Sequence, residues 1–287
     1  MSSAEEESGE RDRGLRTFRL VLEYAGSGFE GWQLQAGPRE ARTVQGVLLE
    51  AIRSVTGADA AVRGAGRTDA GVHALAQVAS VRVATALDAG TLQRALNARL
   101  PADVAVRAAA PAPPGWDALR AARGKHYRYQ IWNGRVRSPL RAARWAHLPE
   151  ALSLEAMRRA AGAFVGRHDF AALQAAGSSV KTTVRTLTRL ELSGEAGGEL
   201  VLDVEGEGFL RHMVRNLAGT LVEIGRGRWG PERAAALLAS RDRGLAGPTA
   251  PAHGLTLVAV RDDFDTGPAP RAAGEAPDSI DGSGPVG

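Results

Sequence analysis

The chain of 287 residues contains no cysteine, and only two of its 36 basic residues are lysine. The lack of cysteine excludes disulfide bonds and thiolate zinc sites, and it gives no sign of an oxidising compartment. No apolar run approaches the roughly 18 residues that a membrane-spanning helix needs. The acidic segment at the start of the chain is also unlike a secretory signal. These features predict a cytoplasmic protein that has no membrane contact.

Charge is distributed unevenly along the chain. The formal net charge is +4, yet residues 1–15 hold five acids and two arginines, and residues 264–287 hold four acids and one arginine. Each end therefore has a net charge of −3, and the segment between them carries about +10. Arginine binds phosphates with two parallel hydrogen bonds and stacks on bases. A codon bias toward arginine would explain the scarcity of lysine but not the positive excess, so the charge favours a nucleic-acid partner.

Hydrophobic periodicity predicts a mixture of strands and helices. Alternating apolar residues predict strands over 16–25, 60–63, 73–83, 103–110, 125–132, 183–194, 199–206 and 254–260. Apolar residues at helical spacing predict helices over 43–57, 91–101, 153–166, 209–225 and 231–240. Thr43 and Ser153 are suitable N-caps, and Gly57 is a suitable end for the first helix. Because strands and helices do not alternate strictly, we expect an α+β fold with mainly antiparallel sheets flanked by helices.

Composition also suggests how the chain is divided. The proline-rich stretch at 111–115 separates two segments of similar make-up, which predicts an N-terminal half over 16–112 and a C-terminal half over 113–263. Both ends of the chain, 1–15 and 264–287, are rich in small and polar residues with little to bury. We therefore expect them to be disordered tails.

The stretch "GAGRTDAG" at residues 64–71 is the most unusual loop of the sequence. A dinucleotide-binding fingerprint would need a third glycine where the chain has Asp69, and a phosphate-binding Walker loop would need a lysine, whereas the only lysines are Lys125 and Lys181. Two readings remain. Asp69 caps a turn in a purely structural loop, or it is a catalytic carboxylate in a loop whose glycines let a ligand approach closely.

The residues near Asp69 in the sequence are relevant to its interpretation as a catalytic carboxylate. In a locally extended loop Arg67 lies on the same side as Asp69, and its guanidinium would keep the carboxylate ionised at neutral pH. An ionised, oriented carboxylate acts as a nucleophile or a general base. The six histidines show no metal-ligand spacing, and no GxSxG motif is present, so we expect neither a metal site nor a serine hydrolase.

At this point a family resemblance becomes visible. "GRTDAGVHA" (66–74) resembles the signature of the tRNA pseudouridine synthases that modify nucleotides 38 to 40 of the anticodon arm. Further segments resemble the family in the family's own order: "YAGSGFEGWQLQ", "TVQGVLLEAI", "KHYRYQIWN", "GRHDFAAL", "FLRHMVRNLAGTLVEIGRG" and "PAHGLTLVAV". The resemblance covers about residues 16–262. The chain departs from the pattern at Ala25, where the family usually has aspartate, and at Trp116, where it usually has phenylalanine.

The resemblance implies a fold and an activity. The fold would be that of the pseudouridine synthases, and the chain would be an isomerase that converts uridine to pseudouridine at positions 38, 39 and 40 of the tRNA anticodon stem-loop. The reaction breaks the N1 glycosidic bond and rejoins the base through carbon 5, so it needs no small-molecule cofactor. The expected partners are tRNA and a second copy of the chain in a homodimer.

The resemblance also implies roles for four residues. Asp69 would be the catalytic aspartate, attacking the base or the ribose or starting an elimination. Tyr127 would stack on the flipped uridine, and Arg67 would position the loop and bind phosphates. Arg211, on the long helix, would pair with Asp69 or fill the space that the base leaves. The sequence pattern alone is also typical of a core aromatic residue at Tyr127. At Arg211 the pattern indicates a solvated helix position, with Arg215 as an equally exposed neighbour.

Two other functions stay open at this stage. The chain could be an RNA-binding protein without catalysis on the same scaffold, or a synthase that modifies other RNA sites. The presence of Asp69, Tyr127 and Arg211 together favours an enzyme.

Overall fold

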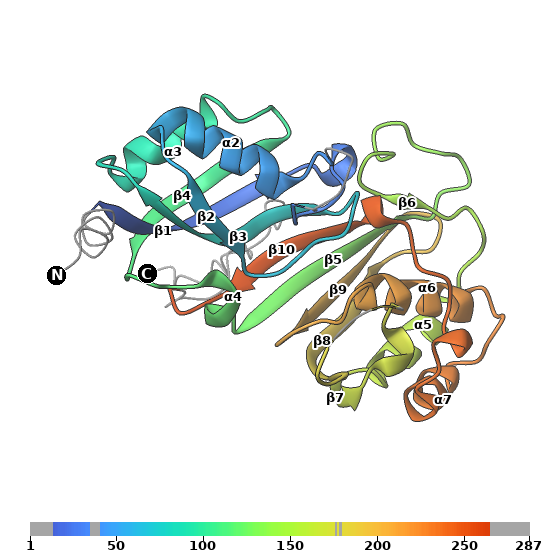
Figure 1. Cartoon of the computed structure of the whole chain (residues 1–287). Coiled ribbons are helices and arrows are strands. Elements are labelled where there is room, and N and C mark those ends of the chain that lie inside the picture. Colours follow the sequence, from blue (N-terminus) through green and yellow to red (C-terminus); the bar gives the residue numbers. More distant parts are fainter. Residues whose placement is uncertain (1–13, 35–40, 176, 178–179, 265–287) are drawn as a thin grey trace, which may run out of the picture.

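A computed structural model describes residues 14–34, 41–175, 177 and 180–264 of the chain (Figure 1). The predicted tails over 1–15 and 264–287 lie outside these ranges, apart from residues 14, 15 and 264. The described ranges contain no helix that is both long enough and apolar enough to span a membrane.

The described strands form one mixed sheet. Its strand order is β4-β1-β3-β10-β5-β9-β8-β7, with β2 paired to β3 and β6 paired to β5. The strands are β1 (Leu15–Tyr24), β2 (Ala60–Gly64), β3 (His73–Ala84), β4 (Val104–Ala112), β5 (Gly124–Trp132), β6 (Ala146–His147), β7 (Gly166–Asp169), β8 (Val184–Gly194), β9 (Glu199–Gly206) and β10 (Leu255–Arg261). Only the pairs β10–β3 and β5–β6 are parallel among these strands. The α+β prediction with mainly antiparallel pairing is therefore confirmed.

Helices lie in two groups, one beside each end of this sheet (Figure 1). They are α2 (Val44–Thr56), α3 (Ala89–Asn97), α4 (Ala118–Ala121), α5 (Leu154–Gly162), α6 (Met213–Gly225) and α7 (Arg233–Ser240). The short α4 contacts β2 and β3. Figure 1 shows α2 and α3 beside β1, β2 and β4, and α5, α6 and α7 beside β8 and β9. Between the two groups, β10 runs along β3 on one side and β5 on the other. The last strand in the chain thus joins the N-terminal strands to the C-terminal ones.

The sheet is continuous where the sequence suggested a boundary between halves. Pro111 and Ala112 of the proline-rich stretch belong to β4 and pair with Phe18 and Thr17 of β1. The division into 16–112 and 113–263 stays an interpretation of sequence similarity.

Helix α2 forms because its ends carry the predicted capping residues. The Thr43 side chain accepts a hydrogen bond from the backbone N–H of Gly46, and Gly57 adopts a left-handed conformation with φ of 70° at the other end. Leu48 and Ile52, one turn apart, are fully buried in the core. Ser153 caps α5 in the same way, by accepting from the backbone N–H of Ala156. Local cap chemistry thus fixes where both helices begin.

The long helix α6 begins later than its apolar pattern predicts. His212 has a positive φ of 61°, which interrupts the helix, and α6 starts at Met213 rather than at residue 209. Leu210 is buried like the helix core, so its apolar character extended the pattern without the helical backbone. The prediction that Arg211 lies on the long helix is therefore wrong: Arg211 lies in the turn that precedes it.

Candidate active site

Asp69 lies in the loop between β2 and β3, close to the middle of the sheet. Its backbone carbonyl accepts a hydrogen bond from the N–H of Val72, 3.2 Å away, which closes a tight turn. The preceding residue, Thr68, is buried, and its hydroxyl lies 2.9 Å from the hydroxyl of Tyr24 on β1. Burial raises the pKa of Tyr24 to about 12, because its effect outweighs the lowering by the hydrogen bonds with Thr68 and Gln77. The buried, neutral hydroxyls of Tyr24 and Thr68 thus attach the loop to β1.

The glycine-rich segment after β1 holds this loop from the side. Trp32 N–H donates to the carbonyl of Thr68 over 3.1 Å. A Cβ on Gly26 would lie 1.9 Å from the carbonyl oxygen of Val72, and a Cβ on Gly31, whose φ is +99°, would lie 2.7 Å from that of Thr68. No side chain fits at these two positions. The two glycine-rich stretches of the sequence therefore pack against each other and set the position of Asp69.

The carboxylate of Asp69 is bound by Arg215 of α6. Arg215 Nη1 donates to Asp69 Oδ2 over 3.2 Å, and Arg215 Nε donates to the backbone carbonyl of Ala250 over 2.8 Å. The Arg215 side chain is 15% exposed and that of Asp69 is 27% exposed. The guanidinium is thus held at two points, and the carboxylate keeps one side open to solvent. Residues separated by 146 positions in sequence form this ion pair.

Arg215, rather than Arg211, is the arginine that the fold brings to Asp69. Arg211 is exposed, and the hydrogen bonds and ion pairs found among the described residues do not join it to Asp69. The expectation that Arg215 is as exposed as Arg211 is wrong, because the turn at His212 points the first turn of α6 toward the loop of Asp69. Both arginines were visible in the sequence four residues apart, but the start of the helix decides which of them reaches the carboxylate.

His212 also faces Asp69, a contact that the sequence did not reveal. Its Nε2 lies 3.5 Å from Asp69 Oδ2. Burial lowers the pKa of His212 below its usual value; Asp69 opposes this, while the charges of Arg215, Arg211 and Arg243 add to it. The ring is therefore neutral at pH 7, and Arg215 supplies the positive charge next to the carboxylate.

Tyr127 lies on β5 and is 7% exposed. Its ring meets that of Phe209 edge to face, with 5.1 Å between centroids. Burial raises the pKa of its phenol well above the usual value, and the charges of Tyr24 and Asp69 raise it further. Tyr127 is thus a protonated, largely buried aromatic residue close enough to Asp69 to feel its charge.

Arg67 is exposed on the same loop as Asp69. No ion pair between Arg67 and Asp69 occurs within the described ranges, where the guanidinium next to the carboxylate is that of Arg215. Arg67 therefore presents its charge to solvent at the edge of the loop. No group of three or more histidine, aspartate or glutamate residues that could hold a metal ion occurs in the described part of the chain.

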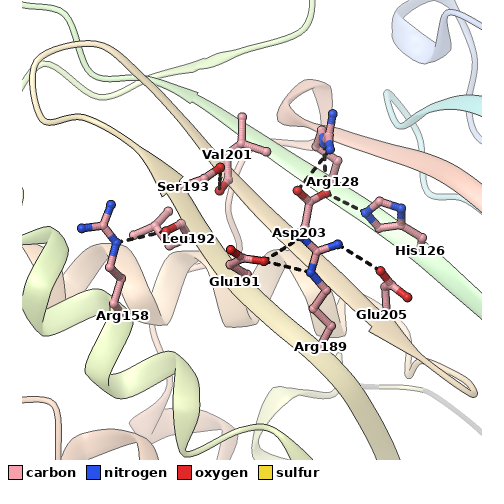
Figure 2. Close-up of polar contacts among 10 residues, drawn as sticks. All are labelled: His126, Arg128, Arg158, Arg189, Glu191, Leu192, Ser193, Val201, Asp203 and Glu205. Carbon is pink, nitrogen blue, oxygen red and sulfur yellow. Dashed lines mark hydrogen bonds and ion pairs between the residues drawn. The ribbon is translucent and has the colours of Figure 1, made fainter. Parts of the chain in front are cut away.

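A second cluster of charges lies across β5, β9 and β8 (Figure 2). Asp203 accepts from His126 Nε2 over 2.6 Å and from both Nε and Nη2 of Arg128, over 2.9 and 3.1 Å. Arg189 donates to Glu191 and Glu205 next to it. His126 and Arg128 alternate with Tyr127 along β5, so this cluster lies on the opposite face of the sheet from Tyr127.

Comparison with known proteins places the chain among RNA-modifying enzymes. The sequence model described as tRNA pseudouridine synthase matches residues 20–118 and 160–263. A protein of Pelobacter propionicus named tRNA pseudouridine synthase A is 47% identical over 246 residues, which cover 86% of this chain and 99% of that protein. A protein of the same name from Myxococcus xanthus is 44% identical over 267 residues, covering 93% of this chain and 98% of its own length. Another from Geobacter sulfurreducens is 44% identical over 247 residues, covering 86% and 100%.

Proposed function

The chain belongs to the tRNA pseudouridine synthase family, and from this premise we propose that it isomerises uridine to pseudouridine at positions 38, 39 and 40 of the tRNA anticodon stem-loop with Asp69 as the catalytic carboxylate. The reaction breaks the bond between N1 of the base and C1′ of the ribose, and forms one between C5 and C1′. The proton on C5 leaves and another is bound at N1, so atoms and electrons balance without a redox carrier.

The ion pair of Asp69 with Arg215 is the observation that carries this proposal. Arg215 is held by the backbone carbonyl of Ala250, so it orients the carboxylate of Asp69 while leaving part of it open. An ionised carboxylate with a free side is the group that this chemistry needs, as nucleophile or as base. The glycines around it permit the close approach of a nucleotide.

Tyr127 and Arg211 supply the binding of the flipped nucleotide. Removing a base from its stack costs a few kcal/mol, which stacking on an aromatic ring offsets. Tyr127 lies close to Asp69 and has one ring edge fixed by Phe209. Of the two roles that the resemblance implies for Arg211, pairing with Asp69 falls to Arg215. Arg211, exposed in the turn before α6, keeps the role of filling the space that the base vacates.

The role of Tyr127 is tested by two substitutions. Tyr127→Phe keeps the ring and should retain affinity for tRNA, whereas Tyr127→Leu fills the core without a flat ring. We expect Tyr127→Leu to lower kcat/KM by at least about tenfold, the loss of roughly one stacking contact. Turnover and thermal melting are the measurements, and equal turnover of Tyr127→Leu and wild type would return Tyr127 to a purely structural role.

Several groups favour tRNA as the polyanionic substrate. The basic segment between the acidic ends attracts the phosphate backbone, and the exposed Arg67 is placed to bind phosphates beside Asp69. We also expect two copies of the chain to associate as a homodimer in the cytoplasm. Analytical ultracentrifugation measures the association directly, and a monomer at micromolar concentration with full activity would contradict it.

Site-resolved product mapping tests the proposed function. Anticodon stem-loop transcripts with a single uridine at 38, 39 or 40 should each be converted, and a transcript with cytidine at all three positions should not. Conversion elsewhere in tRNA, with none at these positions, would make the chain a synthase with other targets. Tight binding without any conversion would make it an RNA-binding protein.

A further inference from the structure

Lys125 lies on β5, on the same face of the sheet as Tyr127 and beside the loop of Asp69. It precedes Tyr127 by two positions on the strand, so both side chains leave the same face of the sheet. A Cβ on Gly66 would lie 2.8 Å from Lys125 Nζ and 3.0 Å from its Cε. The ammonium group therefore occupies the space that the missing side chain of Gly66 leaves open, three residues before Asp69.

No carboxylate among the described residues pairs with the ammonium group of Lys125. Lys125 is half-buried, and neither an aspartate nor a glutamate forms an ion pair with it in the described part of the chain. Burial lowers the pKa of its ammonium group, and the charge of Arg185 lowers it further. A partly buried cation that lacks a counterion is costly unless a ligand supplies one.

Arg185 on β8 is the second cation at this place. Lys125 pairs with Gly206 of β9, which pairs with Leu187 of β8, and Arg185 lies two residues before Leu187 on the same strand. Its Nη1 donates to the carbonyls of Thr182 and Val184, over 2.9 and 2.6 Å. Among the described hydrogen bonds and ion pairs, Nε and Nη2 of Arg185 take part in none. Gly208 lies next to this side chain, since a Cβ on it would lie 3.8 Å from Arg185 Nε.

Arg189 shows what an arginine of the same strand looks like when its charge is balanced. It lies four residues further along β8, but the register of β8 shifts between Leu187 and Arg189, so its side chain leaves the opposite face of the sheet. There it donates to Glu191 and Glu205 (Figure 2). Neither Lys125 nor Arg185 has such partners within the described residues. The difference points to an anion that comes from outside the chain.

We propose that Lys125 and Arg185 form a subsite that binds one backbone phosphate of the RNA next to the target uridine. The inference rests on the proposed function and deepens it. Lysine acts as a point charge on the phosphate, and the free edge of the Arg185 guanidinium adds charge-assisted hydrogen bonds. Because Lys125 touches the loop of Asp69 and shares its strand with Tyr127, a phosphate bound there fixes the strand while the base leaves its stack.

Charge removal at the subsite is the first experiment. Lys125→Met keeps the aliphatic stem and Arg185→Met removes the guanidinium, with Arg189→Met on the opposite face as the matched control. With an anticodon stem-loop RNA, each of the first two should raise KM about tenfold and make the plot of log kcat/KM against log salt shallower by about 0.7 to 0.9. Arg189→Met should change neither quantity. The melting temperature of Lys125→Met should not fall, because the substitution removes a partly buried charge.

The second experiment identifies the phosphate. Stem-loop RNAs carry one neutral methylphosphonate, placed in turn at each phosphate flanking the target uridine. At one position the substitution should cost wild type about tenfold in KM but cost Lys125→Met less than about twofold, the signature of a direct contact in a double-mutant cycle. Equal losses in both proteins at every position, or an unchanged KM and salt slope for Lys125→Met, would overturn the subsite. A wild-type protein that makes no pseudouridine in the unmodified RNA would instead remove the proposed function and the subsite with it.

Discussion

Two aspartates of this chain, Asp69 and Asp203, are bound by arginine and face histidine, yet their surroundings differ. Asp203 accepts three hydrogen bonds, from His126 and Arg128, and its side chain is 8% exposed. Among the described residues the carboxylate of Asp69 accepts one hydrogen bond, from Arg215, and its side chain is 27% exposed. A buried carboxylate with most of its acceptor positions filled stabilises the fold, whereas one with open positions can bind and react with a substrate.

The pKa of Asp203 reflects the same difference. Burial would raise this pKa, but the hydrogen bonds and charges of His126 and Arg128 outweigh burial and hold it below the usual range. The carboxylate of Asp203 is therefore ionised across the physiological pH range. At Asp69 the neighbouring His212 is kept neutral, so a single guanidinium balances the carboxylate.

Removing the carboxylate of Asp203 should have the largest effect on stability. Asp203→Ala leaves His126 and Arg128 partly buried without their acceptor, and we expect it to cost about 3 kcal/mol of unfolding free energy. Urea denaturation measures this, and turnover per folded molecule should stay within about threefold of wild type. The exposed neighbour Glu191 provides the control, since Glu191→Ala should cost less than about 0.5 kcal/mol. A large loss of turnover in folded Asp203→Ala would remove the distinction between the two carboxylates.

Substituting Arg215, the partner of Asp69, should lower the rate of turnover rather than the stability. The guanidinium of Arg215 spans Asp69 and the carbonyl of Ala250, and the single ammonium of a lysine reaches only one of them. We expect Arg215→Lys to lower kcat about a hundredfold, or roughly 2.7 kcal/mol, with little change in melting temperature. Arg211→Lys is the contrasting variant: because Arg211 is assigned to nucleotide binding and not to Asp69, it should raise KM while kcat stays within about threefold. If Arg211→Lys loses more turnover than Arg215→Lys, the role of Arg215 is wrong.

The smallest expected effect is a pH dependence of stability. The pKa of His212 is lower in the folded chain than in the unfolded chain. Between these two pKa values, unfolding therefore binds a proton at His212. Stability should therefore decline as the pH falls from about 6.5 toward the lowered pKa, and be fully present above 6.5. His212→Asn tolerates the positive φ and should flatten the decline, which urea denaturation at pH 5, 6 and 7 would measure. An unchanged slope would mean that His212 is not the group that titrates.

Much of this arrangement could be predicted from the sequence where local chemistry decides it. Thr43, Gly57 and Ser153 set helix ends through their own caps, and the alternation of β5 placed Tyr127 correctly on a sheet face. The position of β10 between β3 and β5 depends on pairing between distant segments, which periodicity does not encode.

The same limit explains the error at the candidate site. The apolar pattern from Leu210 onward favoured one continuous helix, and the family resemblance implied Arg211 on that helix as a partner of Asp69. The left-handed turn at His212 arises where the chain packs against the rest of the fold, and it shifts the contact by one helical turn to Arg215. The sequence prediction named only Arg211 and treated Arg215 as an exposed neighbour, whereas the backbone conformation at His212 brings Arg215 to the carboxylate.

The central claim is that the partly exposed carboxylate of Asp69 is the reacting group. The most direct test is the rate of tritium release from carbon 5 of labelled uridine in tRNA, measured for Asp69→Asn alongside its affinity for the same tRNA. We predict no detectable turnover, with a dissociation constant within about tenfold of wild type because phosphate contacts dominate binding. Substantial tritium release by Asp69→Asn would contradict the claim and remove Asp69 from the mechanism.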